Sequence, residues 1–184
     1  VFSNVYSTKI FKAELDADSA RIVNANSFIS FLEDTYIPRI LRTSTRWATF
    51  TAIEYIDKTN NPIAPNLASL NDVYQNLVFN GTLDGSLATY QINMENYTLE
   101  KWFNNISTEV ENSFHFDLSF KLNDASLDVY QYSPWRMGSN FSVDYALATD
   151  TAAWNASVSY LINYSILGFD DPLYLMNAHP DYYN

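Results

Sequence analysis

The clearest chemical signal in the sequence is a set of asparagines placed to accept N-linked glycans. Each is followed two positions later by Ser or Thr, and the chain holds six such N-x-S/T sequons. The Asn, Ser and Thr content would give roughly three or four by chance, so the excess is mild. The pattern predicts a glycosylated extracellular surface, with an Asn- and Ser-rich strand surface as the alternative, at Asn80, Asn96, Asn105, Asn140, Asn155 and Asn163.

Residues that could perform acid–base or metal chemistry are sparse. His115 and Asp117 would point the same way on a strand, but the other histidine, His179, lies in the terminal tail. We therefore interpret the pair as a solvated strand face. Carboxylates cluster at Glu109/Glu111, Asp170/Asp171 and Glu14/Asp16/Asp18. The last cluster is spaced like a calcium loop but lacks the glycine and distal glutamate, which leaves a weak surface calcium site as an alternative.

Composition excludes several classes of function. The chain has 184 residues, no cysteine and four glycines, so it contains no disulfide, no thiolate site and no glycine-rich phosphate loop. Its net charge of −11 makes nucleic acid and anionic membranes poor partners. We predict no catalytic residue, no metal and no cofactor.

Two further groups of residues are candidates for contacts with other molecules. Arg39, Arg42 and Arg46 lie close together on a predicted helix of an acidic protein, and they face carboxylates either in this chain or on a neighbouring subunit. Among the many aromatic residues, Trp135 and Trp154 lie beside predicted loops. They are the two candidate ligand contacts, whereas core or sheet packing is the simpler reading of the others.

The first sixty residues are predicted to be helical. From Asn26 onward the apolar residues recur mostly at three- and four-residue spacings. Pro38 either kinks this helix or opens a second one. If it is continuous from Asn26 to Lys58, the helix is about 50 Å long. A shorter helical piece is predicted near Leu70–Leu77, and Thr98 is the predicted cap of another helix that ends near Asn112.

After that helix the apolar period changes to two, which predicts half-buried strands. The first alternates from Phe114 to Leu122, and Asn123-Asp124 is the predicted turn into a second. We expect four strands in a meander: residues 114–122, 127–132, 141–147 and 158–166.

The predicted class is therefore α+β: a long N-terminal helix and a second helix packed on a four-stranded antiparallel sheet. We expect one extracytoplasmic domain over residues 1–184. Its parts are a helical segment (1–60), an irregular connection (61–97), a helix (98–113), the antiparallel sheet (114–170) and a C-terminal tail (171–184).

About half of the chain, mostly its C-terminal part, resembles a family of uncharacterised archaeal secreted proteins that are pilin-like. The residues that carry the resemblance are structural: Thr98–Trp102, Ser133-Pro134-Trp135, Trp154, and the final strand and turn from Ile162 to Tyr174. The resemblance implies an extracytoplasmic domain tethered by a membrane helix that is absent from this chain. It assigns no catalytic residue here.

Together these observations favour a non-enzymatic cell-surface protein, a pilin-like structural or filament subunit that is N-glycosylated. It would associate with itself or with other cell-surface proteins. The alternative is an extracellular binding module for a glycan or a partner protein, and an extracellular hydrolase is the third reading.

Overall fold

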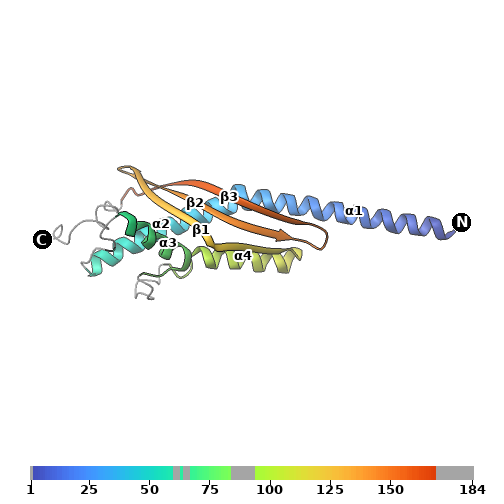
Figure 1. Ribbon diagram of the computed structural model, residues 1–184, viewed down its shortest axis with the longest axis horizontal. Helices are drawn as coiled ribbons and strands as arrows, with labels where there is room; N and C mark the ends of the chain where they lie inside the picture. Colours follow the sequence, from blue (N-terminus) through green and yellow to red (C-terminus); the bar gives the residue numbers. More distant parts are fainter. Residues whose placement is uncertain (1, 60–62, 64–66, 84–93, 169–184) are drawn as a thin grey trace.

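The computed structural model describes residues 2–59, 63, 67–83 and 94–168, with side chains in the first helix from Asp16 onward. Figure 1 shows an elongated molecule in which a long helix runs beside a three-stranded sheet and continues well beyond it. The class is α+β, as predicted. The predicted tail and the last residues of the predicted sheet segment lie outside the described ranges.

The long N-terminal helix is confirmed. It consists of α1 (Phe2–Phe31), a π-helical turn η1 (Leu32–Tyr36) and α2 (Ile37–Thr59). The π turn is explained by Pro38, which has no N–H and whose ring would clash with the carbonyl of Asp34 in a regular helix. The helix widens instead, and the Ile37 N–H donates to the Leu32 carbonyl, five residues back. The proline thus neither ends the helix nor begins a separate one.

Two shorter helices follow, α3 (Leu67–Asn80) and α4 (Leu99–Phe114). Thr98 caps α4 as predicted, because its side-chain oxygen accepts the Lys101 N–H at 3.3 Å. The helix runs further than expected and ends at His115, which adopts a left-handed conformation with φ of 58°. Phe114 is therefore the last residue of the helix, and its assignment to the first strand was wrong.

The sheet has three strands in the described residues, not four. They are β1 (Asp117–Ser133), β2 (Arg136–Ala148) and β3 (Ala153–Ser165), in the order β1-β2-β3 with antiparallel neighbours. The two strands predicted on either side of Asn123-Asp124 are one long strand. Between Lys121 and Ser126, β1 advances five residues while β2 advances two, so the extra residues bulge out of the ladder.

β1 pairs with β2 on both sides of Asn123-Asp124, so the chain does not reverse there. The two polar residues therefore form part of an irregular strand. The real reversal comes later, at Pro134 and Trp135.

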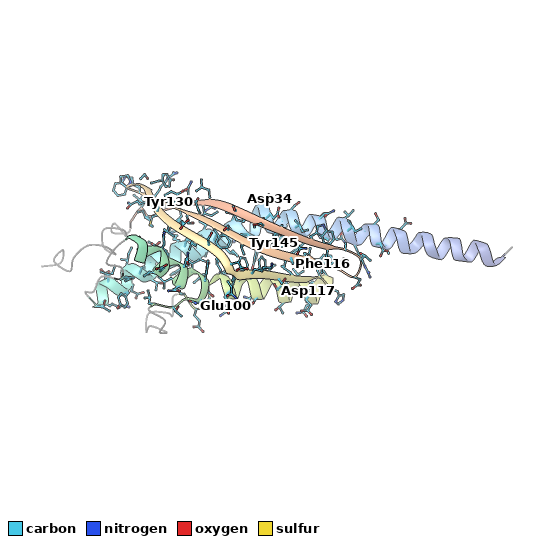
Figure 2. The ribbon with its side chains drawn as sticks, in the orientation of Figure 1. Asp34, Glu100, Phe116, Asp117, Tyr130 and Tyr145 are labelled. Carbon is cyan, nitrogen blue, oxygen red and sulfur yellow. The ribbon has the colours of Figure 1, made fainter. Side chains whose placement is uncertain are left out.

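The helices cover one face of the sheet. On β2, residues Ser139 to Leu147 alternate between buried and more exposed, as expected for a strand with one covered face. Stacking of Phe103 of α4 on Phe120 of β1, with ring centroids 3.9 Å apart, joins the two layers. On the other face the described residues place no helix, and Asn140, Ser159 and Leu161 are among its exposed side chains. Figure 2 shows side chains along both sides of the sheet.

Candidate functional site

The six sequon asparagines are all exposed. Asn140, Asn155 and Asn163 lie on β2 and β3, with their side chains on the open face of the sheet. The other three belong to the helical part: Asn80 ends α3, Asn96 lies in the turn before α4, and Asn105 lies on α4. Each is placed where a glycan would extend into solvent. Glycosylation itself stays a prediction.

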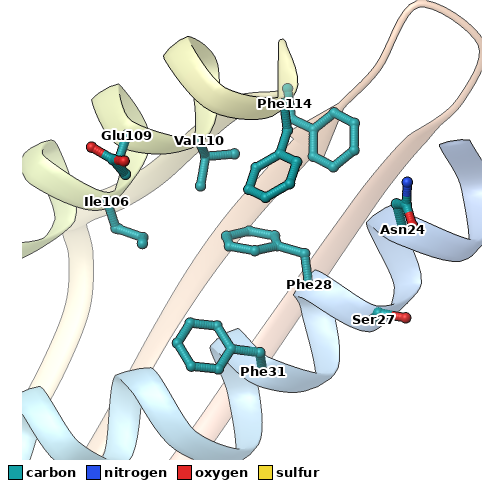
Figure 3. Close-up of a pocket in the computed structure, with 9 residues that line it drawn as sticks. Asn24, Ser27, Phe28, Phe31, Ile106, Glu109, Val110 and Phe114 are labelled. Atoms are coloured by element: carbon teal, nitrogen blue, oxygen red, sulfur yellow. The ribbon is translucent and has the colours of Figure 1, made fainter.

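An open groove of about 450 Å³ lies between α1 and α4. Figure 3 shows Phe28 and Phe31 of α1 directed across it toward Ile106, Val110 and Phe114 of α4. Phe31 and Phe114 are about half exposed. Polar groups are confined to three of its lining residues: Asn24, Ser27 and Glu109. The groove can receive apolar side chains, and its one hydroxyl, that of Ser27, donates to the Val23 carbonyl at 2.9 Å.

A cluster of polar side chains lies where the π turn meets the sheet. The Tyr145 hydroxyl donates to a Glu33 carboxylate oxygen at 2.6 Å, which joins η1 to β2. Burial raises the pKa of Tyr145, and the bond to Glu33 raises it further. Burial, together with Glu33 and Asp34, also raises the pKa of Tyr160 on β3. Both phenols therefore stay neutral, and the Tyr145–Glu33 hydrogen bond holds the helix against the sheet. Figure 2 labels Asp34 and Tyr145 in this region.

The arginines predicted as an interface lie on α2 with exposed side chains. Arg39, Arg42 and Arg46 are spaced three and four residues apart and so share one side of the helix. Tyr36, just before them, donates its hydroxyl to the Trp102 carbonyl of α4 at 3.0 Å. An interface at the arginines stays a prediction.

The two candidate tryptophans are in different surroundings. Trp135 lies at the turn between β1 and β2 with 61% of its surface exposed. Trp154 is half-buried on β3 and packs against the core. The structure therefore leaves Trp135 open to a ligand, while Trp154 contributes to the packing of the sheet on the helices.

The predicted geometry of His115 and Asp117 was wrong. His115 follows the helix end in a left-handed conformation, and only Asp117 belongs to the strand. Residues 14–18, whose carboxylates are spaced as in a calcium loop, do not form a loop, because this segment is part of α1. In the described ranges, no three His, Asp or Glu side chains gather to hold a metal ion. Asp170 and Asp171 fall outside those ranges.

Sequence reasoning missed the groove and the Glu33–Tyr145 bond. Phe28 belongs to the helical apolar pattern, but its groove exists only because α4 lies opposite. Tyr145 and Glu33 are 112 positions apart, and no local pattern connects them. Pro38 was the one local signal for the Glu33–Tyr145 bond. A proline inside a helical pattern distorts the helix locally, and this distortion can change the direction of nearby polar side chains such as Glu33.

Comparison with known proteins finds no match to a protein family, a curated protein or a solved structure. In the described part of the chain, no helix is both long enough and apolar enough to cross a membrane.

Proposed function

We propose that this protein is a non-enzymatic, pilin-like structural subunit of the cell surface that assembles with copies of itself. The observation that carries the proposal is the helix α1, whose first part extends beyond the sheet and α4 (Figure 1). Helices in water gain most of their stability from packing an apolar side against a neighbour. A helix that extends from the body of its own chain is therefore suited to packing against another molecule.

The exposed part of α1 supports this reading. From Asp16 to Asn24 every side chain is exposed except Asp18, which is half-buried. Apolar residues are among them, and Val23 has 60% of its surface exposed. The described body first buries this helix completely at Ala25. The apolar groove between α1 and α4 opens beside the same segment and offers a matching apolar surface.

The extracellular part of the proposal rests on the exposure of all six sequon asparagines. A buried sequon would argue against glycosylation, because a glycan cannot be accommodated in a core. The acidic, cysteine-free composition is compatible with an exported protein that relies on its hydrophobic core.

Assembly is tested by sedimentation velocity and electron microscopy on the full chain over a range of concentrations. We expect Val23→Asp to weaken assembly by about tenfold or more, because it places a charge in an apolar contact. Asn123→Asp adds the same charge at an exposed position of β1, away from α1 and the groove, and is the matched control. Concentration-independent monomers for the unmodified chain would refute the proposal.

A binding module is the second candidate, and Trp135 favours it. Its exposed ring lies at a hairpin turn, and Tyr132, three residues earlier near the end of β1, has 45% of its surface exposed. Two aromatic side chains at a hairpin turn could bind a sugar ring or a partner protein. Glycan-array binding that Trp135→Ala abolishes, together with a strictly monomeric chain, would favour this candidate.

A further inference from the structure

We propose that the outer edge of β3 pairs antiparallel with β3 of a second copy, so that two sheets join into one. The inference deepens the self-assembly proposed above and rests on it. Figure 1 shows β3 at one edge of the sheet. Strand edges carry unpaired backbone groups, and most proteins protect them against pairing with another chain.

Two backbone hydrogen bonds at the ends of β3 define which of its residues face outward. The Ile166 N–H donates to the Trp135 carbonyl at 3.0 Å, and the Thr149 N–H donates to the Ala152 carbonyl at 2.8 Å. In an antiparallel ladder the bonded residues alternate. The even-numbered residues of β3 therefore bond to β2. The odd-numbered residues from Ala153 to Ser165 direct their N–H and C=O groups to the outer edge, where the described residues provide no backbone partner.

The opposite edge of the sheet is protected. On β1 the Val129 N–H donates to Asn71 Oδ1 at 3.0 Å, and Gln75 Nε2 donates to the Leu127 carbonyl at 3.2 Å. Side chains of α3 thus satisfy backbone groups that would otherwise be available for pairing. β1 also contains the irregular segment between Lys121 and Ser126 and several charged residues, and both features discourage strand addition.

In the part of the chain that the structure describes, β3 has none of these protections. Its thirteen residues, Ala153 to Ser165, include no charged residue, no proline and no glycine. Its helix-facing side chains are less covered than those of β2: Ala156, Val158 and Tyr160 are half-buried, whereas Phe141, Val143 and Tyr145 are buried. A strand laid along this edge would cover that apolar surface and satisfy the backbone groups at the same time.

A second copy suits this edge better than an unrelated strand for reasons of charge and symmetry. Two copies with a net charge of −11 each repel one another, and the uncharged segment from Thr151 to Gly168 adds nothing to this repulsion. An antiparallel two-fold pairing also matches the strand with itself.

In the register of full overlap, Ser159 lies opposite Ser159 of the second copy. Val158 then lies opposite Tyr160 of the second copy on the helix side, an aromatic and β-branched pair of the kind that stabilises sheets.

The test uses the full chain produced without glycans and measures amide hydrogen exchange and sedimentation as concentration rises. We expect the amides of Asn155, Ser157, Ser159 and Leu161 to become protected together with association. Ser159→Pro removes only an N–H that points away from β2, and should weaken association on the order of tenfold or more.

Ser159→Lys is the second variant, in case the proline impairs folding, because it places two lysines opposite each other. Ser119→Lys adds the same charge on the open face of β1 and should associate normally.

The outcomes separate this inference from the proposal on which it rests. Association that persists in both Ser159 variants, with unprotected β3 amides, would overturn the edge pairing and leave self-assembly standing. Absence of association at every concentration would overturn both. Concentration-dependent protection of β3 that survives Val23→Asp would support the edge pairing and count against assembly through α1.

Discussion

A buried group of hydroxyls shows how single residues fix the packing of this molecule. Thr49 of α2 places its hydroxyl oxygen 2.9 Å from that of Tyr74 on α3 and 3.0 Å from that of Tyr164 on β3. Both phenols also approach the sulfur of Met137, at 3.8 and 3.7 Å. Three elements thus meet at one threonine. Because their hydroxyls are hydrogen-bonded, the tyrosines can be fully buried without leaving these polar groups unsatisfied.

The same burial makes stability depend on pH in the alkaline range. Burial raises the pKa of Tyr164 to about 12 from its ordinary value of 10.0, and it raises the pKa of Tyr74 as well. Below pH 10 both the folded and the unfolded state hold these protons. Above it the unfolded state releases them first, so the free energy of unfolding should fall from about pH 10 to about pH 12.

Urea unfolding between pH 8 and pH 11 measures this loss. Tyr164→Phe should make the decline shallower, because one of the shifted groups is gone. The control is Tyr132→Phe, at an exposed position, which should keep the decline of the unmodified chain. An equal decline in both variants would contradict the assignment.

The helix α4 illustrates how local sequence defines an element. Its N-cap, Thr98, accepts a backbone N–H, and Glu100 lies in the first turn, where a negative charge is favourable. The apolar side of the helix presents Leu99, Phe103 and Val110, all buried. Capping and amphipathicity agree here, which explains why the prediction of this helix was correct at its start.

Removal of the cap should destabilise the protein. Thr98→Ala leaves the Lys101 N–H without its side-chain partner and should cost about 1 kcal/mol in the free energy of unfolding. Thr108→Ala is the control, since this exposed threonine lies inside the helix and alanine is the better helix former. Equal losses in the two variants, measured by urea unfolding, would show that the cap has no special role.

At the scale of the whole molecule, charge and shape determine how copies can meet. The protein is strongly acidic, yet Arg39, Arg42 and Arg46 lie together on α2. Such a local positive patch would attract an acidic surface of a neighbouring copy. The projecting α1, the uncharged edge of β3 and this patch are three separate surfaces, and an extended assembly needs more than one.

Charge reversal tests the arginine patch. We expect Arg42→Glu to weaken assembly without loss of folding, and rising salt to weaken assembly of the unmodified chain in the same direction. Lys121→Glu reverses an exposed charge on β1 and should have little effect on assembly. Unchanged sedimentation of Arg42→Glu would assign the patch to contacts within the chain.

Glycosylation is tested by the intact mass of protein from its native source. We expect a mass well above 21.1 kDa that returns to this value on deglycosylation, with glycans mapped to the six sequons. A mass equal to the bare chain would remove the main support for an extracellular location.

The sequence by itself determined those features that depend on neighbouring residues. Thr98 identified a helix start because its own side chain forms the cap. The alternation in residues 141–147 identified a strand with one buried face, and the composition excluded thiol and phosphate-loop chemistry. The long helix was predictable for the same reason, because helical periodicity is a local property.

Only the tertiary structure decided which segments meet. It joined the two strands predicted around Asn123-Asp124 into one, because the ladder with β2 absorbs the extra residues as a bulge. It converted the Pro38 interruption into a π turn and placed Glu33 against Tyr145. Among the described residues, it left β3 rather than β1 with an open edge. Each of these outcomes depends on residues far apart in the chain, whose contacts no local periodicity encodes.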